Sequence, residues 1–275
     1  MPRERNVIAE QRRRAIADLA AKQGSIRVSE LTEMFSVDET TIRRDLAALA
    51  GRGILKRSHG GAVVRAVDGP EARVRHESVF SSRMFEYAEE KQGIGVRAAE
   101  LVEDGSTVAI DAGTTAVYMA RALRGKRDLV VVTNAITTAM ELVDIPDITL
   151  IMTGGVVRRA TGGAAGDLAL VTLRELRVDK AFITTHSVSI DGGLTEPSFD
   201  EVSVKRAMIS AASEVVLLAD HSKFGREALA RTAPLSAIDH IVTSAGIDPA
   251  FVEAINETGI GVSVADPIPL DIPTL

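Results

Sequence analysis

The segment from Val37 to Ala62 constrains the fold more than any other part of the chain, because it combines a capped amphipathic helix with a glycine-containing basic hairpin. Asp38 can cap the helix by accepting a backbone N–H bond. Ile42, Leu46 and Leu49 are four and three residues apart, so they share one apolar face. The pattern predicts a helix that packs through one face and leaves the other face open.

The open face of this helix carries hydroxyl and guanidinium groups. At 100° per residue, Thr40, Thr41 and Arg44 point away from the apolar face. Arg43 lies on its flank. An Arg guanidinium can donate two parallel hydrogen bonds to a guanine edge or to a phosphate. These residues predict a DNA-reading face, with an ordinary solvated amphipathic helix as the alternative.

The flanking residues complete a winged helix-turn-helix. A first helix is expected over about residues 7–22. A second helix, capped by Ser29, carries its apolar side chains at Leu31, Met34 and Phe35. Gly60 and Gly61 allow the tight return of the hairpin. The residues left to approach DNA phosphates are Lys56, Arg57 and His59.

Charge is distributed unevenly along the chain. Residues 1–65 hold 13 Lys and Arg against 8 Asp and Glu, a net charge of +5, whereas the rest of the chain carries −11. A basic module joined to an acidic one suits a protein that touches DNA through one end. The alternative is that a small excess of Arg is ordinary surface chemistry.

Composition excludes several classes of protein. With 275 residues, 45% of them hydrophobic, the chain can bury two sizeable cores. The absence of Cys excludes disulfides, thiolate metal sites and Cys nucleophiles. No segment has the pattern of a signal peptide or a membrane span. We therefore expect a cytoplasmic protein with no metal and no cofactor.

The sequence predicts a winged helix-turn-helix domain over residues 1–66, a charged linker over 67–81, and an α/β domain over 82–275. A helix is expected over 82–103, with a break near Gly93 and Gly95. Short apolar runs then alternate with helical stretches, which is typical of a parallel sheet covered on both faces. The strands are expected at 107–111, 129–133, 148–152, 181–184, 215–219, 240–243 and 262–264.

Polar residues and glycines gather at the ends of these strands, where ligands of open parallel sheets bind. Gly113 lets the backbone approach an anion, while Thr114, Thr115 and the free N–H groups of a helix start can donate to it. Together the strand-end residues suit a phosphorylated sugar. The other members of this set are Asp111, Thr133, Asn134, Gly154, Gly155, Lys205, Asp220 and Lys223.

Each of these candidates also has a purely structural explanation. The Gly-Thr-Thr turn and Asn134 can simply cap helices, and the glycine pair can form a turn. Lys205 can be a solvated helix charge, and Lys223 with Asp220 can be a surface ion pair.

The residues from Val37 to Ala62 resemble the DNA-binding domain of the DeoR family of bacterial transcriptional regulators. The family pattern V-S-x-x-T-I-R-R-D-L, followed by a leucine, a short basic stretch and H-G-G-A, matches almost position by position. Asp38 stands where the family usually has Ser. Both residues cap helices, but a carboxylate repels phosphates, so no phosphate contact is expected from Asp38.

The rest of the chain is similar to the sensor domain of the same family. The resemblance implies a fold like that of ribose-5-phosphate isomerase and a phosphorylated effector. It also implies an effector site at the family's D-x-G-T-T, T-N, G-G, V-K-R-A-M and D-x-S-K motifs, which match Asp111 to Thr115, Thr133–Asn134, Gly154–Gly155, Lys205, and Asp220 to Lys223.

The segment from Thr184 to Pro197 departs from the family pattern. Thr184 and Ser187 stand where glycines are common, and Glu196 stands where a hydroxyl is frequent. Glu196 and His186 are further candidates for effector contact. A structural histidine, with its ring satisfied inside the fold, is the alternative for His186.

These observations predict a DNA-binding regulator, a repressor of a carbohydrate operon by family tendency, that binds as a homo-oligomer and responds to a sugar phosphate. The chief alternative is a sugar-phosphate isomerase or deaminase fused to a DNA-binding head, with Asp111, Glu196, and Lys205 or Lys223 as proton-transfer groups. The isomerase acid motif D-G-A-D has no counterpart in the stretch from Thr184 to Ser187, which favours a regulator without enzyme activity. A pure scaffold is the third alternative.

Overall fold

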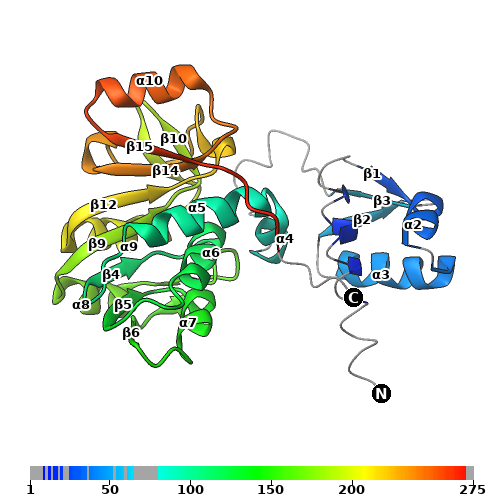
Figure 1. Ribbon diagram of the computed structural model, residues 1–275, viewed down its shortest axis with the longest axis horizontal. Coiled ribbons are helices and arrows are strands. Elements are labelled where there is room, and N and C mark those ends of the chain that lie inside the picture. The colour runs from blue at the N-terminus through cyan, green and yellow to red at the C-terminus, as the bar shows by residue number, and fades with distance from the viewer. Residues whose placement is uncertain are drawn as a thin grey trace. The chain divides into compact units, whose positions relative to one another are not determined.

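A computed structural model describes residues 9, 12–13, 15–17, 19–20, 25–35, 37–51, 54–58, 61–64 and 80–270. The chain forms two compact units, divided between Glu86 and Tyr87 (Figure 1). Most of the expected linker, 67–81, lies outside the described residues.

The N-terminal unit packs helices against a small antiparallel sheet of order β1-β3-β2. The described residues between 9 and 20 are helical, and Ile16, Leu31, Ile42 and Leu46 are buried in its core. The predicted winged helix-turn-helix is confirmed. Its elements are β1 (Ser25–Arg27), α2 (Val28–Phe35), α3 (Glu39–Gly51), β2 (Leu55–Ser58) and β3 (Gly61–Val64).

Three details of this unit differ from expectation. Strand β1, too short to show a pattern in the sequence, adds a third strand by pairing Ile26 with Ala62 of β3. Helix α2 begins at Val28, so Ser29 lies inside it and does not precede it as a cap. Met34 is 58% exposed rather than in the core, because the helix turns that position toward solvent.

The C-terminal unit is built on a seven-stranded sheet of order β15-β14-β12-β9-β4-β5-β6, in which every neighbouring pair is parallel. The predicted parallel α/β fold is confirmed, and each expected strand is present. The strands are β4 (Thr107–Ile110), β5 (Leu129–Thr133), β6 (Ile148–Met152), β9 (Val178–Thr184), β12 (Ala212–Leu218), β14 (His240–Ser244) and β15 (Gly261–Ala265).

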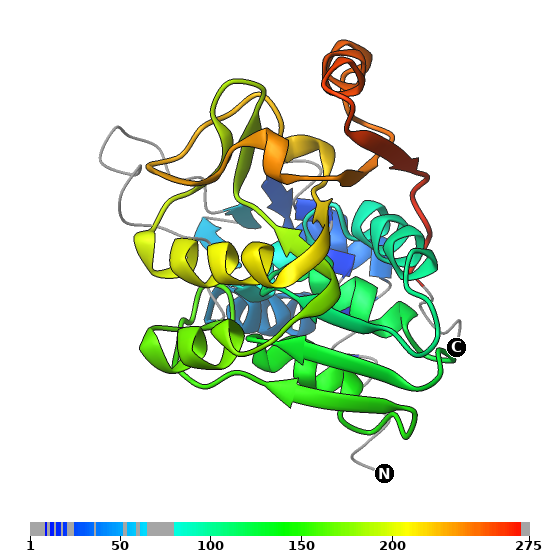
Figure 2. The ribbon, with the colours of Figure 1, turned by 90° about the vertical axis from the view of Figure 1, so that its left-hand side faces the viewer.

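Helices cover both faces of this sheet (Figures 1 and 2). Alternation along β4 sends Val108 and Ile110 into one apolar cluster and Ala109 into the other. The first cluster includes side chains of α5 (Ala88–Glu100), α6 (Thr114–Ala122) and α7 (Ile136–Leu142). The second includes side chains of α8 (Asp167–Arg174), α9 (Phe199–Ala211) and α10 (Pro249–Glu257).

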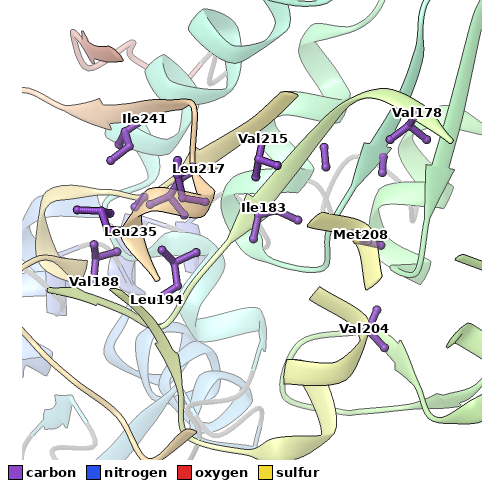
Figure 3. Close-up of a cluster of buried hydrophobic side chains, with 14 of the residues drawn as sticks. Val178, Ile183, Val188, Leu194, Val204, Met208, Val215, Leu217, Leu235 and Ile241 are labelled. Atoms are coloured by element: carbon purple, nitrogen blue, oxygen red, sulfur yellow. The ribbon is translucent and has the colours of Figure 1, made fainter. Parts of the chain in front are cut away.

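Figure 3 shows the second cluster, where Val204 and Met208 of α9 face strand residues such as Ile183 and Leu217. A small antiparallel sheet of order β10-β11-β13 adds to this cluster. The remaining elements are β7 (Val156–Val157), β8 (Ala164–Ala165), β10 (Ser187–Ser189), β11 (Gly193–Glu196), β13 (Ala230–Ala233) and the 3-10 helices η2 (His221–Lys223) and η3 (Leu235–Ala237).

The order of the strands reverses beside β4. The chain proceeds from β4 to β5 and β6 on one side, then returns to place β9, β12, β14 and β15 on the other. In open parallel sheets such a reversal leaves a crevice at the carboxyl ends of the two strands between which it occurs. Here those strands are β4 and β9.

The helix expected over 82–103 is broken, but at a different place. Helix α4 (Phe80–Phe85) ends before α5, and Tyr87 between them has a left-handed φ of 53°. Gly93 and Gly95 lie inside α5. A Cβ on Gly95 would stand 2.6 Å from the backbone of Tyr118 and Met119, so this glycine permits close packing of α5 on α6.

We expect Gly95→Ala to destabilise the C-terminal unit by about 1–3 kcal/mol, because the new methyl group meets backbone that cannot move aside. Denaturant unfolding of the full chain measures the loss. Gly51→Ala is the control, since nothing lies within 4 Å of that position and Ala favours a helix. Equal stability of the Gly95 variant and the native chain would contradict the close-packing argument.

Candidate functional sites

Helix α3 presents the predicted reading face to solvent. Thr40, Arg43 and Arg44 are exposed, Thr41 is half-buried, and the apolar face is buried as expected. The predicted cap at Asp38 is also present, since its Oδ1 accepts the backbone N–H of Thr41 at 2.8 Å.

The four predicted reading residues are not equally available. The Thr41 hydroxyl donates to Asp38 Oδ2 at 2.7 Å, and this bond lowers the pKa of Asp38. Arg43 Nη2 lies 2.7 Å from Glu39 Oε1, one helical turn before it. Arg44 has no hydrogen bond or ion pair within the described part of the chain. Arg44 can therefore meet a duplex without first breaking an internal contact.

An acidic residue that we did not predict as functional fixes this helix in place. Asp45 is buried, and its two carboxylate oxygens contact Arg12 Nε at 2.6 Å and Arg13 Nε at 2.8 Å. The contacts tie α3 to the helical residues near the N-terminus. The signal was present in the sequence, because Asp45 lies three residues after Ile42 on the apolar face, where an acid needs a partner.

The wing is present as the antiparallel pair β2 and β3, with Lys56 opposite Val63 and Arg57 opposite Ala62. The side chains of Lys56 and Arg57 lie outside the described part of the chain, as does the whole of His59. Their contact with phosphate stays a prediction.

A buried ion pair occupies the crevice between β4 and β9. Asp111, directly after β4, lies 2.5 Å by its Oδ2 from Lys205 Nζ of α9. The same oxygen accepts the N–H of Thr184, at the end of β9, at 3.0 Å. Lys205 also donates to the carbonyl of Thr184 at 2.8 Å. The three residues therefore connect β4, β9 and α9 at one point.

The burial of this pair decides against one of the structural alternatives. Both side chains are at least 96% buried, so Lys205 is not a solvated helix charge. Burial by itself would lower the pKa of Lys205. The negative charges of Asp111, Glu196 and Glu201 outweigh the effect of burial, so the pKa of Lys205 is raised. Lys205 stays charged, and Asp111 balances its charge.

Glu196, on β11, is the second carboxylate at this lysine. Its Oε1 lies 3.4 Å from Lys205 Nζ and accepts the backbone N–H of His186 at 3.2 Å. Burial raises the pKa of Glu196 to about 7, helped by the charges of Glu201 and Asp111 and opposed by Lys205. The group therefore titrates near neutral pH.

A further set of contacts extends the charged cluster, and it was not found from the sequence. Glu201 Oε1 accepts the hydroxyl of Thr161 at 2.5 Å and lies 3.2 Å from Arg158 Nη1. No motif marked Arg158 or Glu201, because a loop residue and a helix residue 43 positions apart meet only in the folded chain.

Helix α6 begins at the same crevice, three residues after Asp111. No side chain caps this helix, and Thr114 and Thr115 are in its first turn. The helix dipole and the N–H groups of such a first turn favour an anion. The structure gives a packing reason for glycine at position 113: a Cβ there would stand 2.7 Å from the Thr184 hydroxyl, which donates to the carbonyl of Ala112.

Thr133 and Asn134 border the same loop. The Thr133 hydroxyl donates to the carbonyl of Ile110 at 2.7 Å, and Asn134 Nδ2 donates to the carbonyl of Ala164 at 3.0 Å. Asn134 Oδ1 is buried and has no hydrogen-bond partner among the described residues. Asn134 therefore links the end of β5 to Ala164 of β8, and its Oδ1 can still accept a hydrogen bond.

The remaining predicted site residues lie in turns, at a helix cap or on the surface. Gly155 has φ 127°, and a Cβ there would meet the backbone of Ala165, so it serves a turn. Asp220 caps η2 by accepting the N–H of Ser222, and Lys223 Nζ lies 3.8 Å from Asp220 Oδ2. The His186 side chain is exposed. Gly154 is also exposed and lies beside Leu168.

Two broader properties of the described ranges bear on the chemistry. No group of three His, Asp or Glu side chains in them is arranged to hold a metal ion. None of the helices described there has the length and apolar character needed to cross a bilayer.

Both halves of the chain match family models. Residues 12–66 match the DeoR-like helix-turn-helix domain, and residues 86–245 match the DeoR C-terminal sensor domain. The chain is 34% identical over 257 residues to the uncharacterized HTH-type transcriptional regulator YulB of Bacillus subtilis, covering 94% of this chain and 97% of that one. It is 37% identical over 235 residues to the glycerol-3-phosphate regulon repressor of Escherichia coli, covering 86% and 90%.

Solved structures with a similar arrangement include ribose 5-phosphate isomerase A from Methanocaldococcus jannaschii. It is 21% identical, covers 49% of this chain and 53% of its own, and has a TM-score of 0.37. The score is low, so the fold class rests on the sheet order itself.

The raised pKa of Glu196 predicts a pH-dependent stability. Below about pH 4.5 the carboxyl is protonated whether the chain is folded or unfolded; as pH rises to about 7, only the unfolded chain ionises. Stability therefore falls over this range, by up to about 3 kcal/mol, and then levels off. Thermal unfolding between pH 5 and 8 should show a smaller fall for Glu196→Gln than for the native chain. The exposed Glu175→Gln is the control, and a Glu196→Gln profile parallel to the native one would refute the assignment.

Proposed function

This chain belongs to the DeoR family of transcriptional regulators, and we propose that it binds an operator through α3 and represses genes of carbohydrate metabolism until a phosphorylated sugar or polyol binds the C-terminal unit. A relative 37% identical to it is a glycerol-3-phosphate regulon repressor, which supports an effector of this chemical class.

The reading face carries the DNA-binding part of the proposal. Arg44 is exposed on α3 and has no partner among the residues that the structure describes, while Asp45 on the next position anchors the helix. Thr40, Thr41 and Arg43 flank Arg44, and the predicted contacts of Lys56, Arg57 and His59 brace the wing on phosphates. Arg43 and Thr41 exchange their internal contacts for DNA contacts when the duplex arrives.

The uncapped start of α6 carries the effector part. We assign the phosphate to the N–H groups and hydroxyls of Thr114 and Thr115, because an anion is favoured there and Lys205 is already paired. Glu196, the last residue of β11, and Asn134, which follows β5, have oxygen acceptors suited to sugar hydroxyls. The roles of Gly154, Gly155, Asp220, Lys223 and His186 would be in shaping the surroundings.

We further propose that the site does not turn over its ligand. Asp111 and Lys205, the groups that an isomerase would need for proton transfer, are buried and bonded to one another. Incubation with sugar phosphates, followed by product analysis, tests this point, and turnover at an enzyme-like rate would favour the isomerase alternative.

The effector acts through a free-energy difference between two arrangements of the chain. A ligand between β4 and β9 contacts loops that Asp111, Thr184 and Lys205 hold together. Operators read by helix-turn-helix proteins consist of paired half-sites, so we include a homo-oligomer in the proposal. The coupling then works by changing how well two reading helices fit the two half-sites.

Arg44→Ala should weaken binding to the DNA upstream of the chain's own gene by about ten- to a hundredfold, the loss expected for one bidentate base contact. Fluorescence anisotropy at several salt concentrations measures the loss. Arg174→Ala is the control, because Arg174 is an exposed arginine of the C-terminal unit. If both variants bind like the native chain, Arg44 is not a reading residue.

Gly113→Ala should abolish the response of DNA binding to the effector while unliganded DNA binding is retained. The new methyl group displaces Thr184, and with it the loop at the start of α6. The measurement is operator affinity with and without members of a sugar-phosphate panel that includes glycerol 3-phosphate. Unphosphorylated glycerol and inorganic phosphate are controls. A native response in the variant would place the effector elsewhere.

A further inference from the structure

The exposed apolar side chains of the described residues are concentrated at one edge of the large sheet. Strand β6 is that edge, since β5 is its one partner among the described strands. Eight of the 13 large apolar side chains that are exposed belong to the elements around it. They are Ile136, Met140, Val143, Met152, Val156, Val157, Leu168 and Val171, and we call them the β6 margin.

The part of the β6 margin on α7 points away from the rest of its unit. Glu141 faces α6, where it accepts from Arg121 at 2.8 Å. At 100° per residue, Met140 lies 100° around the helix from Glu141, and Val143 lies 160° from it. Both side chains are more than 60% exposed. The apolar stripe of α7 is therefore turned toward the outer side of the sheet.

The other part of the β6 margin lies on the opposite face. Helix α8 buries Leu173 in the cluster shared with α9, whereas Leu168 and Val171 are exposed. Leu168 lies beside Gly154, just beyond the end of β6, because a Cβ on that glycine would stand 3.2 Å from it. Apolar side chains thus border β6 on both faces of the sheet.

The strand itself lacks three features that usually protect a sheet edge. Its sequence, ITLIM, contains no charge and no proline, and no bulge interrupts its pairing with β5. The backbone N–H and C=O groups on the side of β6 away from β5 can form hydrogen bonds with another strand. An edge strand pairs with a copy of itself antiparallel when a two-fold axis relates the two chains.

Charge around β6 fits an antiparallel pair. Asp144 and Asp147 are exposed where β6 begins. Antiparallel alignment places these acidic residues of the two copies at opposite ends of the paired strands. A parallel alignment would place like charges together.

We propose that the β6 margin is the surface through which a second copy of this chain binds, with the two β6 strands antiparallel and their sheets continuous. The inference rests on the homo-oligomer included in the proposed function and names its interface. Residue Ala265 marks the end of the opposite edge strand, β15, which carries only Val264 as an exposed large apolar residue.

Sedimentation velocity of the full chain across a concentration series tests the proposal. Met140→Glu should weaken self-association by at least about tenfold, since it places a charge in the apolar interface. Leu229→Glu is the matched control, because Leu229 is 67% exposed, close to the 73% of Met140, but lies outside the β6 margin. Circular dichroism checks that both variants fold.

Hydrogen exchange supplies a readout that needs no variant. Amides of β6 should become protected as the native chain is concentrated, while those of β15 do not change. A chain that is monomeric at every concentration would overturn both this proposal and the proposed homo-oligomer. An oligomer that is unaffected by Met140→Glu, or whose β6 amides stay unprotected, would overturn only the β6 assignment and leave the homo-oligomer standing.

Discussion

The buried pair of Asp111 and Lys205 is the contact on which the C-terminal unit depends most. It joins the end of β4 to α9, and through Thr184 it also holds the end of β9. Removing one member of such a pair leaves an uncompensated buried charge, at a cost of about 3–5 kcal/mol. The crevice where the strand order reverses is therefore fixed by electrostatics before any ligand is bound.

The N-terminal unit uses the same device at a smaller scale. Asp45 is on the buried face of α3 and is held by Arg12 and Arg13, so α3 cannot rotate without separating charges. Arg44, on the next position, points to solvent. The buried Asp45 holds the helix rigidly, and the exposed Arg44 offers its guanidinium to solvent. Precise contact with a DNA groove requires such a rigidly held side chain.

The large sheet gives its centre and its edge different roles. The polar ends of strands and the start of α6 meet between β4 and β9. Asp111 and Lys205 are paired there, and the pKa of Glu196 is raised to about 7. At β6 the exposed groups are apolar and the backbone is open on one side. A ligand at the centre and a second chain at the edge would act on the same rigid layer of strands, which is a direct route for coupling.

The sequence by itself determined the amphipathic helix α3, the parallel sheet and the positions of strand ends, because these follow from local periodicity, capping and glycine placement. Residues such as Asp38, Ile42 and Leu46 behave as their spacing predicts. Only the tertiary structure decided which charges meet: Glu201 with Arg158, and Lys205 with Asp111. Such pairings join residues far apart in the chain, and their energies depend on burial, which no local pattern records.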